Sequence, residues 1–409
     1  MDKRGILFEK QSGFRSGFST DSCVIQLSDF MKHEISNGNY AGMVLIDLQK
    51  AFDTVDHRIM LDKLRAIGVT SIDWFQSYLS NRIQCVEVNG VRSEFLPITC
   101  GVPQGSILGP QLFLLYINDL SISVDCQLSL YADDSALFFA HSDPSVIANR
   151  LSTELSSCWK WLINNKLSLH AGKTECVLFG SKSSLRRVGE FQVVCEGRAV
   201  QRVDHVKYLG VLLDASLSGA NHVTHVLKTC VGRLAFLYRN SNLLDFDSRK
   251  TLCTSLIQPH IDYCCSSWYE GLTASLKQKL DVIQRKLVRF INGFESRHHV
   301  GPSELLSLSW LSIRKRVDYF KLIHLFKIKH GNGPQYLRSS IVSVSEAHSY
   351  GTRGSRANFH MSKSLSRCPS SFAFSCVKRW NALPSRIKTI DSLPAFKREL
   401  KKFLLSSND

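Results

Sequence analysis

The stretch LSLYADDSALFF, residues 128–139, constrains the fold of this chain most, because two aspartates interrupt an apolar run typical of β structure. Successive residues on a strand point to opposite faces of the sheet, so Asp133 and Asp134 cannot both serve one site from a straight strand. Adjacent carboxylates also repel each other and are costly to desolvate without a positive partner. We therefore predict a tight hairpin with both aspartates at its tip.

A third carboxylate is expected at the same edge of the sheet. The run YAGMVLIDL is short, apolar and contains β-branched residues, which predicts a buried strand that ends near Asp47. Hard divalent cations prefer carboxylate oxygens, and two Mg²⁺ ions about 4 Å apart can clamp the attacking and leaving oxygens of a phosphoryl displacement. An Asp-Asp pair by itself is more often a turn or a helix cap, so the metal-site interpretation depends on the motifs around it.

Helix and strand patterns alternate through the first half of the chain. Helices are predicted within STDSCVIQLSDFMKHEISNG, DTVDHRIMLDKLRAIGV and SVIANRLSTELSSCWKWLINNKL, and strands at TECVLFG and KYLGVLLD. Asn89-Gly90 predicts a hairpin. Asp53 and Asp56 are expected in the first turn of the second helix, where acids complement the helix dipole, rather than as metal ligands. This order of elements favours an α+β fold, with a sheet that carries helices on one face.

Charge separates the two halves of the chain. Residues 1–219 hold 21 basic and 23 acidic residues, whereas residues 220–409 hold 30 basic and 12 acidic. In the second half strand signals thin out, and segments such as LKQKLDVIQRKLVRFI are amphipathic helices with a basic face. A basic half suggests a polyanionic partner such as nucleic acid, although a solvated surface explains the charge equally well.

Cysteine usage and hydropathy narrow the class of protein. The 13 cysteines are scattered and form no CxxC pair, so neither a disulfide framework nor a zinc knuckle is expected. No run reaches the roughly 18 to 20 apolar residues that span a bilayer, and the first thirty residues lack a signal-like apolar core. We expect an intracellular protein without membrane association, with nucleus and cytoplasm equally compatible with the sequence.

Six motifs then follow one another in order: QSGFRSGFST, LIDLQKAFDTVDH, GVPQGSILGPQLFLLYIND, YADDSALF, LSLHAGKTECVLFG and VKYLGVLLD. This succession resembles the reverse transcriptases of non-LTR retrotransposons of the LINE type. The resemblance implies a right-hand polymerase, whose palm is a small antiparallel sheet with helices, joined to partial fingers and to a mainly helical thumb and C-terminal region. The implied boundaries are residues 1–40 for partial fingers, 41–215 for the palm with a fingers insertion at about 61–95, 216–300 for the thumb-like region and 301–409 for the basic C-terminal region.

The resemblance also implies roles for the charged residues. Asp47 and Asp133 match the aspartates that hold two metal ions, expected to be Mg²⁺ with Mn²⁺ as a substitute, and Asp134 is the third carboxylate of that site. Lys173 matches a lysine near the triphosphate that can protonate the departing pyrophosphate; a solvated loop lysine is the simpler alternative. Arg15 matches a fingers residue whose guanidinium can pair with the triphosphate.

Further matches concern the nucleotide and the primer. Phe52 corresponds to a ring that packs under the incoming sugar and excludes a 2′-hydroxyl, although a core phenylalanine is the simpler interpretation. Gln104 and Gly105 belong to the PQG loop beside the nascent base pair and the template. The primer-binding residues implied by the family are the following: Tyr208, Leu209 and Gly210.

The implied function is that of an RNA-directed DNA polymerase, which uses an RNA template, a DNA primer and dNTPs in a two-metal nucleotidyl transfer onto the primer 3′-hydroxyl. The chain starts close to QSGFR, and His170 stands where the family often has asparagine, so either an N-terminally truncated reverse transcriptase or a decayed element is expected. One alternative is a catalytically inactive nucleic-acid-binding remnant of such an element. Another is a maturase of the group II intron type, against which KAFDTVDH and the tail favour the LINE type.

Overall fold

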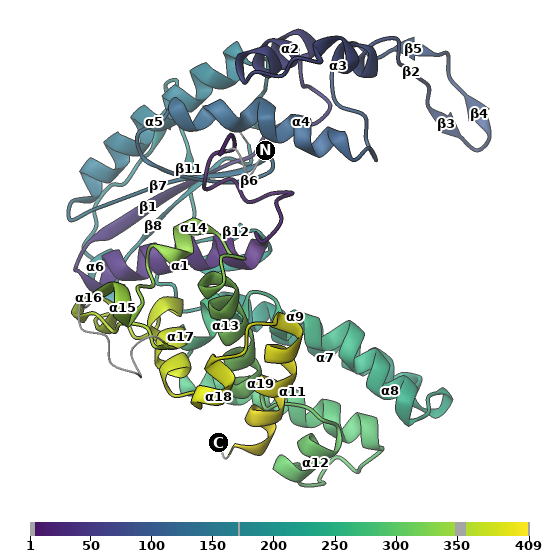
Figure 1. Ribbon diagram of the computed structural model, residues 1–409, viewed down its shortest axis with the longest axis vertical. Helices are drawn as coiled ribbons and strands as arrows, with labels where there is room; N and C mark the ends of the chain where they lie inside the picture. The colour runs from purple at the N-terminus through teal and green to yellow at the C-terminus, as the bar shows by residue number, and fades with distance from the viewer. Residues whose placement is uncertain (1–4, 171, 348–356, 408–409) are drawn as a thin grey trace. The chain divides into compact units, whose positions relative to one another are not determined.

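The computed structural model describes residues 5–170, 172–347 and 357–407, which fall into two compact units (Figure 1). The first unit comprises Met1–Thr20 and Asn39–Asp204, and the second comprises Asp21–Gly38 and His205–Asp409. Within the described ranges, no helix is long and apolar enough to cross a membrane.

A five-stranded sheet forms the centre of the first unit, in the order β11–β8–β1–β7–β6. Its strands are β1 (Tyr40–Ile46), β6 (Gln127–Tyr131), β7 (Asp134–His141), β8 (Glu175–Phe179) and β11 (Gln201–Arg202). β1 pairs antiparallel with β7 and with β8, β6 pairs antiparallel with β7, and β11 pairs parallel with β8. The predicted mixture of helices with a mainly antiparallel sheet is confirmed.

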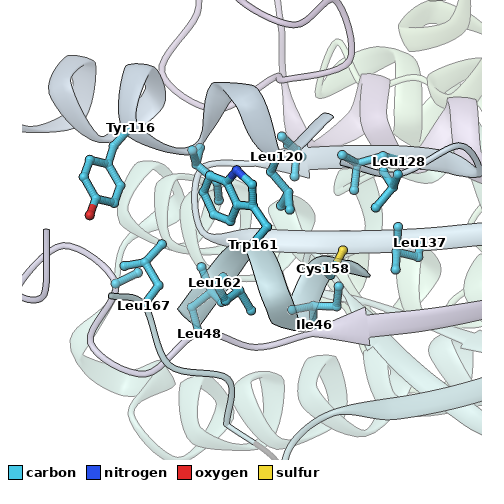
Figure 2. Packing of buried hydrophobic residues seen from close by; sticks show 14 of the residues in the cluster. Ile46, Leu48, Tyr116, Leu120, Leu128, Leu137, Cys158, Trp161, Leu162 and Leu167 are labelled. Carbon is cyan, nitrogen blue, oxygen red and sulfur yellow. The ribbon is translucent and has the colours of Figure 1, made fainter. Parts of the chain in front are cut away.

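Helices cover this sheet and bury its apolar side chains. α5 (Pro144–Asn164) packs against β1 and β7, and Asp143 caps it by accepting a hydrogen bond from the Ser145 backbone N–H at 2.8 Å. α4 (Leu108–Ile117) is apolar around most of its circumference and contributes seven buried residues, so it lies inside the unit rather than on its surface. Figure 2 shows Cys158 and Trp161 of α5 in the same core as Ile46 and Leu137 of the sheet.

The segment between β1 and α4 contains two helices and a β-ribbon. Its elements are α2 (His57–Ala66), α3 (Ile72–Leu79), β2 (Ile83–Gln84), β3 (Glu87–Val88), β4 (Val91–Arg92) and β5 (Leu96–Pro97). β2 pairs with β5 and β3 with β4, and the ribbon projects from the first unit (Figure 1). Asn89 and Gly90 form the turn with φ values of 51° and 82°, so the predicted Asn-Gly hairpin is confirmed. The first unit is completed by α6 (Lys182–Leu185), β9 (Val194–Cys195) and β10 (Arg198–Ala199).

The expectation for the two acids before α2 was only partly right. Asp56 is the N-cap of α2, where its carboxylate accepts from the Ile59 backbone N–H at 2.9 Å, so its structural role is confirmed one residue ahead of the first turn. Asp53 lies in a turn outside the helix. The difference arises because Asp56 begins the helix at His57, which leaves Asp53 free to contact a distant loop.

Helices dominate the second unit, as predicted for the chain beyond residue 220. They are α1 (Thr20–Ser36), α7 (Ala220–Arg239), α8 (Phe246–Leu252), α9 (Gln258–Asp262), α10 (Cys265–Trp268), α11 (Ala274–Asn292), α12 (Pro302–Ser307), α13 (Ile313–Lys329), α14 (Gln335–Arg338), α15 (Val344–Ala347), α16 (Lys363–Ser366), α17 (Phe372–Asn381), α18 (Ser385–Lys388) and α19 (Leu393–Ser406). A hairpin of β12 (His205–Tyr208) with β13 (Val211–Asp214) comes between α1 and α7 in the chain.

Buried polar contacts explain why α1, from the N-terminal segment, belongs to the second unit. The carboxylate of Asp29 accepts from the backbone N–H groups of Phe372 and Ala373 at 2.7 and 2.8 Å, at the positive N-terminal end of α17. Lys32 is also buried, and its ammonium donates to the backbone carbonyls of Ser267 and Ser370 at 2.6 and 3.1 Å. α1 is therefore held by residues more than two hundred positions away in sequence.

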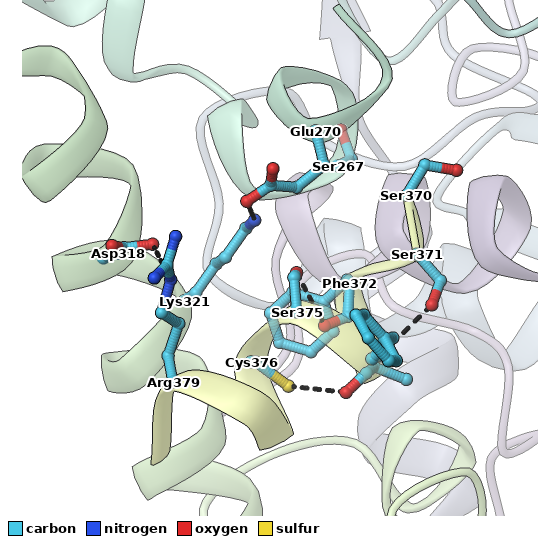
Figure 3. Close-up of polar contacts among 12 residues, drawn as sticks. Ser267, Glu270, Asp318, Lys321, Ser370, Ser371, Phe372, Ser375, Cys376 and Arg379 are labelled. Atoms are coloured by element: carbon cyan, nitrogen blue, oxygen red, sulfur yellow. Dashed lines mark hydrogen bonds and ion pairs between the residues drawn. The ribbon is translucent and has the colours of Figure 1, made fainter. Parts of the chain in front are cut away.

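A buried lysine pairs with a carboxylate in this unit (Figure 3). Lys321 on α13 is 0% exposed, and its ammonium donates to the carboxylate of Glu270 at 2.6 Å. Burial alone would raise the pKa of the Glu270 carboxyl, but the positive charges of Lys321, Lys277 and Arg379 outweigh burial and hold that pKa below its ordinary value. The pair therefore stabilises the fold fully above about pH 4.5, and its contribution is lost as pH falls through the lowered pKa.

Removing one member of the Lys321–Glu270 pair should destabilise the second unit far more than removing both. We expect Glu270→Ala to destabilise the second unit by about 3–5 kcal/mol, because an unpaired ammonium would remain buried. The double variant Glu270→Ala/Lys321→Met should recover most of that loss, since no buried charge is left. Hydrogen exchange of peptides from α13, measured across a urea series, reports both values. Equal losses in the single and double variants would show that the pair itself is not the source of the stability.

Candidate active site

The two adjacent aspartates lie at a hairpin tip, as predicted. Tyr131, the last residue of β6, pairs with Asp134, the first residue of β7, so Ala132 and Asp133 form a two-residue turn. Ala132 has a φ of 57°, a left-handed value that such tight hairpin turns require. Because the chain reverses direction here, the carboxyl groups of Asp133 and Asp134 both lie at one end of the sheet.

The register of the sheet brings Asp47 to the same end. β1 and β7 are antiparallel neighbours, and their last paired residues at this end are Ile46 and Ser135. Beyond this pair, Asp47 follows Ile46 and Asp134 precedes Ser135, so the two aspartates lie opposite each other at this end of the sheet. The convergence expected from the end of the MVLID run is therefore observed.

The pKa of Asp134 depends on the other two acids, which lie close to it. Burial raises the pKa of the Asp134 carboxyl, and the negative charges of Asp133 and Asp47 raise it further. Like charges held together in this way are relieved by a bound cation.

The carboxylates suit a hard divalent cation by donor chemistry and by charge, since oxygen ligands are those that Mg²⁺ and Mn²⁺ take. The side chains as they stand do not form a closed ligand set: in the described part of the chain, no group of three or more His, Cys, Asp or Glu side chains is arranged to hold a metal ion. The assignment of Asp47, Asp133 and Asp134 as metal ligands therefore stays a prediction, which the accumulated negative charge favours.

The segment between α5 and β8 contacts the end of β1. His170 donates its backbone N–H to the Asp47 carbonyl at 2.8 Å, and Lys173 donates its own to the His170 carbonyl at 2.9 Å. These bonds bring the Lys173 ammonium to 3.7 Å from the Asp47 carboxylate, with the lysine side chain 65% exposed. Lys173 is thus brought to the carboxylates, and its exposure leaves the ammonium free to turn toward an anion.

The predicted nucleotide-binding residues Arg15 and Phe52 lie in the same unit. Arg15 donates to the backbone carbonyls of Phe8 and Gln11 at 2.9 and 2.6 Å and stacks over the Phe18 ring. Phe52 is half-buried, and its ring stacks on Phe113 with centroids 4.4 Å apart. The Phe52 ring therefore has a fixed orientation, which both a core role and a role against a sugar require.

The PQG loop is attached to the segment that follows Phe52. Gln104 donates from its side-chain amide to the Asp53 carboxylate at 3.0 Å. Gly101 packs so closely that a Cβ would lie 2.7 Å from the Asp53 carbonyl oxygen, and the His57 ring lies within hydrogen-bond distance of the Gly101 carbonyl. Gly105 has a φ of 78° with open space around it. The sequence patterns did not predict the contact of Asp53 with Gln104, because Asp53 was assigned to the first turn of the following helix.

The predicted primer-binding residues belong to the second unit. Leu209 and Gly210 form the turn between β12 and β13, with φ values of 45° and 82°, and Tyr208 is buried. The Tyr263 hydroxyl donates to the Leu209 carbonyl at 2.7 Å, and a Cβ on Gly210 would meet the Tyr263 ring at 3.0 Å. The hairpin is observed, whereas its role at a primer stays a prediction.

Removing one carboxylate should stabilise the metal-free protein. A carboxyl whose pKa is raised on folding binds more protons in the folded chain than in the unfolded one, so stability falls as pH rises from 3.8 through the raised value. Asp133→Asn removes one of the two repulsive neighbours of Asp134 and should raise the free energy of unfolding at pH 7 by about 0.5 kcal/mol, a small gain because the site is partly solvated. Denaturation at pH 7 and at pH 4, without divalent cations, measures the gain, which should shrink at pH 4. A loss at pH 7 would contradict the repulsion.

Known proteins give the chain a family context. The RNA-directed DNA polymerase from mobile element jockey of Drosophila melanogaster is 28% identical over 297 residues, which cover 69% of this chain and 32% of that protein. The probable RNA-directed DNA polymerase from transposon X-element of Drosophila melanogaster is 27% identical over 304 residues, which cover 72% of this chain and 33% of that protein. The chain thus spans about a third of the length of these relatives.

A solved structure of telomerase from Candida albicans with a fragment of telomeric RNA aligns with 74% of this chain and 52% of its own, at 12% identity and a TM-score of 0.32, a likeness too low to argue from. The family model described as reverse transcriptase (RNA-dependent DNA polymerase) matches residues 3–213, which include the three aspartates, the PQG loop and β12. The resemblance drawn from the six ordered motifs is thereby confirmed. The chain belongs to the reverse transcriptase (RNA-dependent DNA polymerase) family.

Proposed function

We propose that this chain supplies the RNA-directed DNA polymerase activity of a non-LTR, LINE-type element, and that it extends a primer 3′-hydroxyl by nucleotidyl transfer along an RNA template. One observation carries the proposal. Asp133 and Asp134 at the β6–β7 turn lie next to Asp47 at the end of β1, and the ammonium of Lys173 is 3.7 Å from Asp47. Catalysis of phosphoryl transfer requires such a cluster of anionic ligands with a cationic side chain beside it.

In this proposal, the parts of the chain correspond to the palm, fingers and thumb of a right-hand polymerase. The five-stranded sheet with α4 and α5 would be the palm, within residues 41–215, and residues 61–95 its fingers insertion. Residues 1–40 would contribute partial fingers. The helices of residues 216–300 would form the thumb, and residues 301–409 the basic C-terminal region. The mainly antiparallel sheet supports the name palm and the helical second unit supports the name thumb, whereas α1 and the β12–β13 hairpin belong to the second unit and not to the unit of the sheet.

Divalent cations, Mg²⁺ or Mn²⁺, would be held by Asp47 and Asp133, and when bound they supply a lowered pKa at the primer hydroxyl and neutralisation of the triphosphate. Asp134 would add negative charge from the start of β7 without being the main ligand.

The remaining residues of the chain would position and neutralise. Lys173 would leave Asp47 for the triphosphate and donate a proton to the departing pyrophosphate, and its high exposure makes that movement easy. Arg15, whose guanidinium already donates to two backbone carbonyls, would also pair with phosphate oxygens. Catalysis would then consist of positioning and charge neutralisation.

Selection of the nucleotide would depend on Phe52 and the PQG loop. The Phe52 ring, fixed by its stacking on Phe113, would occupy the space of a ribose 2′-hydroxyl and so favour dNTPs. Gln104 and Gly105 would lie beside the nascent base pair, with Gln104 oriented by its hydrogen bond to Asp53. Tyr208, Leu209 and Gly210 would hold the primer end.

The template and primer would be bound largely through their phosphates. Residues 220–409 carry 30 basic against 12 acidic residues, which suits contacts that are independent of sequence and sensitive to salt. The relatives named as RNA-directed DNA polymerases support RNA as the template class. Their much greater length leaves room for activities outside the segment that this chain spans.

Primer extension tests the proposal directly. We expect the purified chain, with Mg²⁺ or Mn²⁺, dNTPs and a DNA primer on an RNA template, to extend the primer, and Asp133→Ala to lower the rate by about 10³-fold or more, since the charge that holds the cation is lost. Template-primer affinity, measured by fluorescence anisotropy, should be unchanged in Asp133→Ala. Equal extension by the two proteins would refute the catalytic role of Asp133. Binding without any extension by the wild type would favour the nucleic-acid-binding remnant.

Sugar discrimination tests the role of Phe52. We expect Phe52→Val to raise the efficiency of ribonucleotide incorporation relative to deoxynucleotide incorporation by about tenfold to a hundredfold, the range that shape exclusion of a small group can supply. The measurement is kcat/KM for one NTP and its dNTP on the same template. Phe113→Leu, which loosens the ring without removing it, is the matched control and should change the ratio less. A ratio unchanged in Phe52→Val would leave Phe52 with only a core role.

A further inference from the structure

A buried glutamine contacts the turn that carries Asp133. Gln11 is 0% exposed, and its side-chain carbonyl oxygen accepts hydrogen bonds from the backbone N–H of Gly13 at 2.9 Å and from that of Ala132 at 3.0 Å. All three residues lie in the first unit. One side-chain atom thus connects the QSG segment to the β6–β7 turn.

The main chain around Gln11 fixes its position. The Ser12 N–H donates to the Leu130 carbonyl at 2.8 Å, and the Leu130 N–H donates to the Lys10 carbonyl at 3.1 Å, so Gln11 and Leu130 form a parallel bridge beside β6. Gly13 approaches even closer, since a Cβ there would lie 2.4 Å from the Ala132 nitrogen. Residues 10–13 are therefore packed onto the hairpin at its tip.

The hydrogen bonds also determine which end of the amide faces the turn. Two N–H groups converge on the same atom, so that atom must be the carbonyl oxygen, because an NH₂ group in its place would face two donors. Gln11 Nε2 is buried and has no hydrogen-bond partner among the described residues. Burying a half-satisfied amide is unfavourable, which indicates that this residue is not explained by filling the core alone.

The Ala132 N–H needs such an acceptor. In a two-residue hairpin the ladder ends at the Tyr131–Asp134 pair, so the N–H of Ala132 has no partner in the sheet. Ala132 also adopts a φ of 57°, a conformation that an alanine holds only when its surroundings impose it. The Gln11 carbonyl satisfies the donor and holds this conformation, and the direction of the following side chain, that of Asp133, depends on it.

We propose that Gln11 is a positioning residue for Asp133, which fixes the β6–β7 turn through the Ala132 N–H and so orients the carboxyl that takes part in metal binding and nucleotidyl transfer. The proposal rests on the proposed function for its catalytic consequence, whereas its effect on the turn and on cation binding does not require activity. Gln11 touches neither a substrate nor a reacting atom in this role.

The first experiment measures the turn itself in the full chain. Gln11→Leu keeps the approximate volume of the side chain and removes the acceptor, so amide exchange in peptides that contain residues 131–134 should accelerate by tenfold or more, since the Ala132 N–H loses its bond. Gly13→Ala is the second variant, because it retains the acceptor and pushes on the same turn. It keeps the test valid if Gln11→Leu fails to fold.

The matched control is Asn118→Ala. The Asn118 side chain accepts from the Phe8 N–H at 2.7 Å and donates to the Ile6 carbonyl at 2.9 Å, so it holds the same N-terminal segment but does not touch the turn. If Gln11 acts only by keeping this segment in place, Asn118→Ala should produce the same changes. If Gln11 orients Asp133, exchange at residues 131–134 should stay at the wild-type rate in Asn118→Ala.

The second experiment measures function with Tb³⁺ as the probe, because its luminescence can be sensitised by the adjacent Tyr131, together with primer extension. We expect Gln11→Leu to weaken Asp133-dependent Tb³⁺ binding about tenfold, as loss of a residue that orients a ligand does. Its kcat should fall by about 10²-fold, with KM for the dNTP changed less than about threefold, because a misplaced carboxyl affects the chemical step more than nucleotide binding.

The outcomes separate the two proposals. If the wild type extends no primer but Gln11→Leu still weakens Tb³⁺ binding and loosens the turn, the proposed function fails and the role of Gln11 stands. Unchanged exchange at residues 131–134 in both variants would overturn the role of Gln11, as would equal effects of Asn118→Ala. Tb³⁺ affinity that does not depend on Gln11, or on Asp133, would overturn it as well.

Discussion

The repulsion between three carboxylates at one end of a sheet is the constraint on which the first unit depends. Asp47 and Asp134 lie at the same end of the neighbouring strands β1 and β7, and Asp133 precedes Asp134 in the two-residue turn between β6 and β7. Neutral side chains at these positions would satisfy the hairpin at lower electrostatic cost. The antiparallel register of β1 with β7 therefore has a functional consequence, because a slip of one residue would send Asp47 to the other face of the sheet.

In the second unit, acidic side chains are neutralised in a different way. There, three of the acids have a cationic partner: Lys321 pairs with Glu270, Arg316 binds Asp262 through both carboxylate oxygens, and Arg379 pairs with Asp318. In the first unit, Lys173 is a partly exposed and distant partner for a cluster of three acids. The contrast indicates that the chain can neutralise buried acids with cationic side chains, and the charge left at the β6–β7 turn supports the proposal that a cation binds there.

Local signals explain which parts of the fold could be predicted. Asn89-Gly90, the capping acid Asp143 and the apolar run before Asp47 each act within a few residues, and the expected hairpin, helix and strand are all observed. The hairpin tip followed from combining such signals, whereas the order of the strands in the sheet was not predicted. Contacts of high sequence separation could not be predicted this way: α1 is held by residues more than two hundred positions later, and Asp53 binds Gln104 fifty-one positions away. For the site, residue type and spacing indicated the carboxylates, whereas the glutamine behind the turn has no signal until its neighbours in space are known.

The identity of the turn residue shows how orientation is achieved. Glycine would adopt the left-handed φ of Ala132 without strain, but it would also allow the turn several other conformations. Alanine costs roughly 1 kcal/mol in this region and has fewer alternatives, so an external contact can select one conformation more completely. The Gln11 carbonyl is that contact, and the absence of a Cβ at Gly13 is what lets it approach. A strained alanine, a buried amide and a glycine together define the direction of Asp133 before any cation is bound, which is the preorganisation that electrostatic catalysis requires.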